Sequence, residues 1–134
     1  MSRRHKLRVG AFGVGRMGRV HLENLIRLAQ QDKIDLVAIG DRFEPTLAAA
    51  RNFTAELGGI PFEQALTKFS SPETMAAAQP LDAVVIASRT EDHARDSLVF
   101  TRLGIPVLVE KPFAGSVVEA VKFHHALGEA GVSR

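Results

Sequence analysis

Residues 9–18 read Val-Gly-Ala-Phe-Gly-Val-Gly-Arg-Met-Gly, an apolar run followed directly by a glycine-rich turn. The turn has the spacing G-x-G-x-x-G, which is weak evidence alone because three glycines often fall at this spacing by chance. Here it follows a predicted strand and opens a predicted helix, as a dinucleotide-binding βαβ unit requires. The segment therefore predicts a nucleotide site in preference to a purely structural turn.

Each glycine of the turn has its own expected role. Gly13 permits the tight turn, Gly15 lets the backbone approach a pyrophosphate, and Gly18 lets the helix pack closely on the strand. Arg16 and Met17 begin the helix, where free amide groups and the helix dipole favour phosphate groups. We expect Met17 to pack at the helix start with its amide near the phosphates.

Strand and helix patterns alternate along the chain, which predicts an α/β fold with a doubly wound parallel sheet of the Rossmann type and about five strands. We expect residues 1–134 to form one dinucleotide-binding domain. Residues 60–62, Ile-Pro-Phe, are expected to form a short edge strand, because proline is confined to sheet edges. The other predicted strands are 7–12, 34–40, 83–87 and 106–109, and the predicted helices are about 16–30, 45–57, 72 onward, 92–103 and 116–129.

Composition and charge exclude several classes of function. The 134 residues are 46% hydrophobic and 24% charged, an ordinary globular mixture, with a formal net charge of +2. Basic residues gather just before and at the start of the first strand, at Arg3, Arg4, Lys6 and Arg8. They could face an anionic partner, but no interleaved aromatic residues or basic helix follow. We therefore expect a solvated N-terminal arm and no nucleic-acid partner.

The chain contains no cysteine, which excludes disulfides and thiolate sites and fits a reducing compartment. No apolar run approaches the roughly 20 residues of a membrane-spanning helix, and the start lacks an apolar signal core. We expect a cytoplasmic protein with no membrane partner. His124 and His125 are adjacent in a predicted helix and point apart, so no metal site is expected.

The acidic residue after the second strand bears on the choice of cofactor. Asp41 follows Gly18 by 41 − 18 = 23 positions, near the spacing of the acid that binds the adenine ribose hydroxyls. A carboxylate there repels a 2′-phosphate and favours NAD over NADP. Arg42 could pair with that phosphate, so NADP stays open. The alternatives are a turn residue at Asp41 and a solvated arginine at Arg42.

Polar residues also follow the fourth and fifth predicted strands. In open parallel sheets ligands bind beyond the carboxyl ends of the strands, so Ser88, Arg89 and Glu110 are expected to face the same crevice. Lys111 follows a strand expected to be buried, and could hydrogen-bond a substrate hydroxyl and relay its proton. Its alternative is a Glu-Lys pair at the strand end. His93 is expected either to touch the ligand or to be a polar residue of a first helical turn.

Several segments resemble, in order, the N-terminal domain of the glucose–fructose oxidoreductase / inositol dehydrogenase / MocA family: residues 9–21, Asp41, 84–88, His93 and 109–112. The Glu-Lys-Pro triplet at 110–112 is much more specific to that family than the glycine turn. The resemblance implies that Lys111 contacts substrate and assists proton transfer, and that Asp41 binds the adenosine ribose. It also implies that Ser88, Arg89 and His93 line the nicotinamide end, although relatives often carry a smaller residue or proline at the position of Arg89.

The resemblance implies an oxidoreductase that transfers hydride between a nicotinamide cofactor and a secondary alcohol or ketone of a sugar, cyclitol or related compound. Relatives have a second α/β domain that carries the substrate pocket, and this chain stops at Arg134 before it. We therefore expect the cofactor-binding half of a dehydrogenase. A stand-alone NAD(H)-binding or sensing module and a structural remnant that binds no nucleotide are the alternatives. A homo-oligomer stays open, because relatives associate through the second domain.

Overall fold

Five parallel strands form the centre of the molecule in the computed structural model, which describes residues 5–112 and 114–129. Arg3 and Arg4 of the predicted arm, and residues 130–134, lie outside these ranges. The strand order is β3-β2-β1-β4-β5. β2 and β3 are added on one side of β1, and β4 and β5 are added on its other side, so the order reverses between β1 and β4. The strands are β1 (Leu7–Phe12), β2 (Ile34–Gly40), β3 (Thr67–Phe69), β4 (Ala83–Ile86) and β5 (Val107–Val109).

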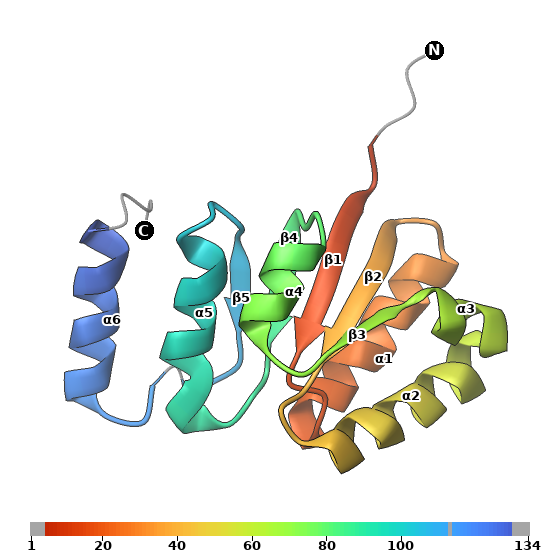
Figure 1. The fold of residues 1–134 in the computed structure, drawn as a ribbon, viewed down its shortest axis with the longest axis horizontal. Helices are drawn as coiled ribbons and strands as arrows, with labels where there is room; N and C mark the ends of the chain where they lie inside the picture. Colours follow the sequence, from red (N-terminus) through yellow and green to blue (C-terminus); the bar gives the residue numbers. More distant parts are fainter. Residues whose placement is uncertain (1–4, 113, 130–134) are drawn as a thin grey trace.

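Helices cover both faces of this sheet, as Figure 1 shows. Helices α1 and α2 pack on one face, α4 and α5 pack on the other, and α6 lies beside α5 at the end of the molecule. The predicted doubly wound Rossmann fold is therefore confirmed. The helices are α1 (Arg16–Gln30), α2 (Glu44–Gly58), α3 (Ile60–Ala65), α4 (Pro72–Ala78), the 3-10 turn η1 (Thr90–Asp92), α5 (His93–Thr101) and α6 (Val117–Glu129).

The alternation of side chains along β1 builds two separate cores. Val9 and Ala11 point to the face covered by α1, where they meet Leu22 and Ile26. Phe12 points to the opposite face, toward α4 and α5. Because side chains alternate with a period of two, a strand with apolar residues at successive positions must be covered on both sides. This double burial fixes where the carboxyl ends of the central strands lie.

The expected strand at residues 60–62 is wrong, since these residues begin helix α3 and β3 starts at Thr67. Gly59 has a φ of +95° and turns the chain out of α2. Pro61 then falls in the first helical turn, where its missing N–H group costs nothing. The remaining predicted strands and helices are confirmed to within about two residues at their ends.

The strand that precedes Lys111 is not buried as expected. Among the described residues, β5 occupies an edge of the sheet and pairs with β4 alone. Leu108 is 60% exposed, and Val107 and Val109 are half-buried. An apolar run of three residues does not distinguish an edge strand from a central one. Within residues 5–112 and 114–129, no helix has the length and apolar character needed to cross a membrane.

Candidate functional site

The carboxyl ends of four strands meet at one edge of the sheet. Backbone hydrogen bonds continue past β1, β4 and β5, because Ala87 donates to Phe12 O at 2.9 Å and Glu110 donates to Ile86 O at 2.9 Å. On the other side, Gly13 donates to Gly40 O at 2.8 Å. These bonds continue the sheet register into the loops. The predicted site residues from four separate segments are thereby brought together.

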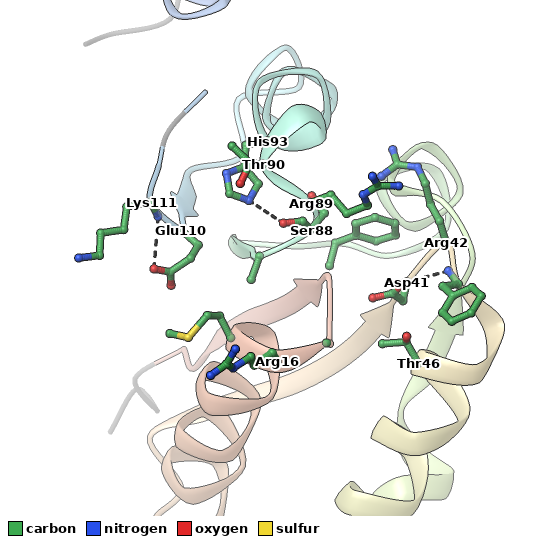
Figure 2. Close-up of a pocket in the computed structure, with 15 residues that line it drawn as sticks. Arg16, Asp41, Arg42, Thr46, Ser88, Arg89, Thr90, His93, Glu110 and Lys111 are labelled. Carbon is green, nitrogen blue, oxygen red and sulfur yellow. Dashed lines mark hydrogen bonds between the residues drawn. The ribbon is translucent and has the colours of Figure 1, made fainter. Parts of the chain in front are cut away.

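A cavity of about 740 Å³ lies at this edge, beside the point where the strand order reverses. Figure 2 shows Asp41, Arg42 and Thr46 at one end of it, and Glu110 and Lys111 at the other. Ten of the twelve residues expected at the site line the cavity: Gly15, Arg16, Met17, Asp41, Arg42, Ser88, Arg89, His93, Glu110 and Lys111. Gly13 and Gly18 shape the turn behind it. Thr90, which follows the fourth predicted strand with Ser88 and Arg89, also lines the cavity, and the sequence analysis missed Phe12, Phe43, Thr46 and Ala87.

The glycine turn has the geometry that the sequence predicts. Gly13 has a φ of +91°, and a Cβ there would lie 2.2 Å from Ser88 N. A Cβ on Gly18 would lie 1.9 Å from Gly13 O, so only glycine lets α1 start this close to β1. Gly15 differs, since the nearest atom to a Cβ there would be Thr46 Cγ2 at 3.8 Å. Space is therefore open above the middle glycine.

The start of α1 can receive an anion. Gly15 is the residue that precedes the helix, and no side chain among the described residues caps its first turn. The first N–H groups of a helix have no partner inside the helix. They carry partial positive charge, so a phosphate group fits there. The open space over Gly15 and these amide groups together fit the diphosphate of a dinucleotide.

Asp41 is bound to the turn itself. One carboxylate oxygen accepts from Val14 N at 3.0 Å, and the other accepts from Phe43 N at 2.9 Å. Each carboxylate oxygen has two lone pairs, so both can accept a further hydrogen bond from a ligand hydroxyl. Asp41 therefore fixes the first turn and presents acceptor oxygens at the end of the cavity at the same time.

Arg42 is partly exposed, with 34% of its side chain accessible, but its guanidinium already has a partner within the chain. Its guanidinium forms a two-bond ion pair with Asp96, with one bond from Nη1 to Oδ2 of 2.8 Å. The Asp96 side chain is 0% exposed, and Asp96 also accepts a hydrogen bond of 2.7 Å from Ser88 Oγ. The contact with Asp96 raises the pKa of Arg42. A carboxylate on α5 thus holds two of the lining residues.

Sequence analysis missed Asp96, although one signal pointed to it. Asp96 lies three positions after His93, and residues three apart share a helix face. Contact with the ligand is one of the two roles expected of His93. A carboxylate one turn further along therefore had to be buried or bound near the same site.

His93 is 2% exposed and bridges two loops. Its Nε2 lies 2.6 Å from Ser88 O, and its Nδ1 lies 2.8 Å from Pro112 O. The imidazole therefore ties the loop after β4 to the Glu-Lys-Pro loop after β5. His93 also lines the cavity and begins α5, so contact with a ligand stays a prediction beside its place in the first helical turn.

Glu110 also has a partner that the sequence did not predict. His21 Nε2, from α1, lies 2.5 Å from Glu110 Oε2, and Lys111 N donates to Oε1 at 3.3 Å. The contact with His21, followed by that of the Lys111 amide, lowers the pKa of Glu110. The Lys111 side chain is exposed and extends away from Asp41 and Arg42 in Figure 2. Glu110 and Lys111 are thus not a simple ion pair at the strand end.

Arg89 lines the cavity but keeps most of its side chain exposed. The Arg89 side chain is 81% exposed and pairs with Glu91 at 2.5 Å. Its φ of −62° is one that proline also adopts, so the arginine changes the side chain and not the loop. In the described part of the chain, no group of three histidine, aspartate or glutamate side chains is arranged to hold a metal ion.

Comparisons with known proteins agree with this geometry. The model of the oxidoreductase family with an NAD-binding Rossmann fold, GFO_IDH_MocA, matches residues 7–133. Inositol 2-dehydrogenase 4 of Saccharopolyspora erythraea is 34% identical over 131 residues, which are 98% of this chain and 35% of that protein. The scyllo-inositol 2-dehydrogenase (NAD(+)) of Bacillus subtilis is 30% identical over 96% of this chain and 34% of its own length.

A solved structure has a similar fold. The WlbA dehydrogenase from Bordetella pertussis, in complex with NADH and UDP-GlcNAcA, superimposes with a TM-score of 0.74 at 30% identity. The match covers 96% of this chain and 35% of that one. The chain thus spans about a third of the length of the relatives it matches. With its sheet order, glycine turn and family match, the chain belongs to the glucose–fructose oxidoreductase / inositol dehydrogenase / MocA family of oxidoreductases with an NAD-binding Rossmann fold.

Proposed function

We propose that residues 1–134 are the NAD(H)-binding domain of a dehydrogenase that acts on a secondary alcohol or ketone of a sugar, cyclitol or related compound. The observation that carries the proposal is the single cavity formed by four strand ends, with an uncapped helix start and Asp41 at one end and Glu110 and Lys111 at the other. An extended ligand with a diphosphate in its middle fits this order of groups.

Residues of the chain divide the binding among them. The first amide groups of α1, next to Gly15, hold the diphosphate. Asp41 accepts hydrogen bonds from the adenine ribose, and its two contacts with backbone N–H groups keep the carboxylate oriented. Glu110 lies at the other end of the cavity, and Ser88 lies between the two ends, with its hydroxyl on the Asp96 carboxylate that also holds Arg42. A bound nicotinamide supplies the carbon that accepts or donates hydride.

Lys111 is the proposed proton-exchanging group. It follows β5 at the end of the cavity, and its Nζ can donate to a substrate hydroxyl oxygen or take up its proton. His93 holds the backbone of the same loop through Pro112 O. Because relatives are about three times longer, a substrate that reaches Lys111 is held in large part by residues beyond this chain. The substrate class is proposed from the names of the relatives, which include inositol dehydrogenases.

Calorimetric titration of the 134-residue chain with NADH tests the proposal. We expect saturable one-to-one binding, and we expect Asp41→Ala to weaken it roughly ten- to a hundredfold, because hydrogen bonds to a charged acceptor are lost. Asp35→Ala is the matched control, since Asp35 lies on the same strand and pairs with Lys6 at the opposite end of the sheet. Absence of NADH binding by the unmodified chain would contradict the proposed function. Equal NADH affinity of the Asp41→Ala and Asp35→Ala variants would contradict only the proposed role of Asp41 and would leave the proposed function standing.

A further inference from the structure

We propose that Asp96 is a specificity-determining residue, which makes the site prefer NAD(H) to NADP(H) by occupying the guanidinium of Arg42. The proposal rests on the proposed function, because it concerns which dinucleotide the same cavity takes. Asp96 is not part of the cavity lining and acts through Arg42.

The two residues at the end of β2 have opposite effects on a 2′-phosphate. Asp41 and Arg42 are adjacent, and both line the same end of the cavity. A carboxylate repels the phosphate of NADP, whereas a guanidinium can hold a phosphate with two parallel hydrogen bonds. The preference between NAD and NADP therefore depends on whether the guanidinium of Arg42 is free to meet the ligand.

Asp96 occupies one two-bond edge of the Arg42 guanidinium, the edge formed by Nη1 and Nη2. Nη1 of Arg42 donates to Oδ2 of Asp96 at 2.8 Å, and Nη2 contacts Oδ1. The Asp96 carboxylate is 0% exposed and the Arg42 side chain is 34% exposed, so the pair is shielded from water on the Asp96 side only. Taking Arg42 away would leave the buried Asp96 carboxylate without its cation, which is unfavourable. A phosphate would have to compete with a carboxylate that is already in place.

Other contacts hold the pair in the same position. Ser88 Oγ donates to Asp96 Oδ2 at 2.7 Å, so the carboxylate is fixed from a second side. Arg42 lies over the Phe12 ring at 5.3 Å, and its Nη1 is 3.6 Å from Asp92 Oδ2. Asp92 is shared with Arg95 at 2.7 Å, so Asp96 is the main partner of Arg42, and no ion pair joins Arg42 to Asp41 among the described residues. This end of the cavity suits a ribose with free hydroxyls.

Titration of the Asp96→Asn variant with NADH and with NADPH tests the proposal. Asparagine keeps the shape of the side chain and removes its charge, so Arg42 is released toward the cavity. We expect the ratio of NADPH affinity to NADH affinity to rise about tenfold, as gain of a charge-assisted phosphate contact predicts. Glu63→Gln is the matched control, because it neutralises a buried carboxylate paired with Arg51 and Lys68 away from the cavity, and it should leave the ratio unchanged.

Two further variants test whether the effect passes through Arg42. Adding Arg42→Gln to Asp96→Asn should cancel the gain, since two residues that act as a pair are not additive. Arg42→Gln alone should change NADPH affinity less than about threefold, because the guanidinium is already withheld. A tenfold loss of NADPH binding in Arg42→Gln would overturn the proposal, and this result does not depend on how Asp96→Asn folds.

The outcomes separate this inference from the proposed function. An unchanged NADPH to NADH ratio in an Asp96→Asn protein that still binds NADH would overturn the role of Asp96 and leave the cofactor site intact. A gain that persists without Arg42 would overturn the route through the guanidinium. Failure of the unmodified chain to bind NADH would overturn both proposals.

Discussion

Gly18 and Gly15 lie in the same turn, but the structure requires glycine at them for different reasons. The Cα of Gly18 lies against the backbone of the turn, where an added Cβ would be 1.9 Å from Gly13 O. That contact is with backbone, which cannot move aside as a flexible side chain can. Gly15 faces the cavity, and its added Cβ would first meet Thr46 Cγ2 at 3.8 Å. One glycine serves the fold and the other leaves room for a ligand.

Substitution by alanine should separate these two roles. Gly18→Ala is expected to lower the free energy of unfolding by about 2 kcal/mol, because the added methyl group forces α1 away from β1. Gly15→Ala should lower it less and weaken NADH binding more, since the methyl group enters the cavity. Urea unfolding and calorimetric titration of both variants measure the two effects. Equal losses of stability in the two variants would contradict this division.

Residues that do not touch the cavity hold several residues that do. Asp96 holds Arg42 and Ser88, and His21 holds Glu110. Their partners are 54, 8 and 89 positions away in the sequence, respectively. Spacing rules within one helix or one motif do not predict such pairs. The electrostatics of the site are thus set by long-range contacts.

Helix α3 is the element that the sequence analysis misplaced, and Glu63 explains its stability. The Glu63 carboxylate pairs with Lys68 Nζ at 2.9 Å and with Arg51 Nε at 3.1 Å. Lys68 also donates to Glu63 O at 2.6 Å. A single side chain of this short helix therefore links α2, α3 and β3. A residue pattern of six positions cannot show that a glutamate will be buried with two cations.

This cluster should contribute to acid unfolding. The contact with Lys68, and then that with Arg51, lowers the pKa of Glu63 in the folded protein. A carboxylate with a lowered folded pKa stabilises fully above its unfolded pKa of about 4.3, and the stabilisation is lost as pH falls through the folded pKa. We expect Glu63→Gln to lower the free energy of unfolding by roughly 1 kcal/mol at pH 7.

Urea unfolding of both proteins between pH 7 and pH 3 measures the effect. The two stabilities should converge as the pH falls below the ordinary glutamate range, because the native carboxylate then becomes protonated as well. A stability difference that stays constant over the whole range would show that packing around Glu63, and not its charge, is responsible.

At the scale of the whole molecule, the cavity is shared by segments that lie far apart in the sequence. Its lining runs from Phe12 to Lys111, and it includes the ends of β1, β2, β4 and β5. The two separate cores lie on opposite faces of the sheet whose strands lead to it. A ligand that contacts all four strand ends binds only when the sheet is assembled. Binding should therefore stabilise the fold as a unit.

Thermal unfolding with NADH should show this coupling. At a concentration of NADH about a hundredfold above its dissociation constant, the free energy of unfolding should rise by about 2.7 kcal/mol. The unfolding temperature should then rise by roughly 5–10 °C in one cooperative transition. Asp41→Ala should reduce the shift at the same NADH concentration. An NADH-independent unfolding temperature would contradict assembly of the site from the folded sheet.

The local sequence by itself determined the fold class, the glycine turn and the cavity-lining residues that follow strands. These depend on short-range rules: Gly13 must reach a positive φ, Gly18 must lack a Cβ, and polar residues after parallel strands share one edge of a sheet. The family resemblance rested on the same segments, and the family match confirms it. That Asp41 and Lys111 act on a ligand stays a prediction.

Only the tertiary structure decided the position of β5 at the sheet edge, the helical state of residues 60–65 and the partners of the lining residues. Each depends on which segments become neighbours, and no local pattern encodes that. The apolar sequence of β5 is compatible with both an edge strand and a central strand. The sequence around Arg42 does not show that the buried Asp96 carboxylate pairs with it. The charge that a dinucleotide meets at this site is therefore a property of the folded chain.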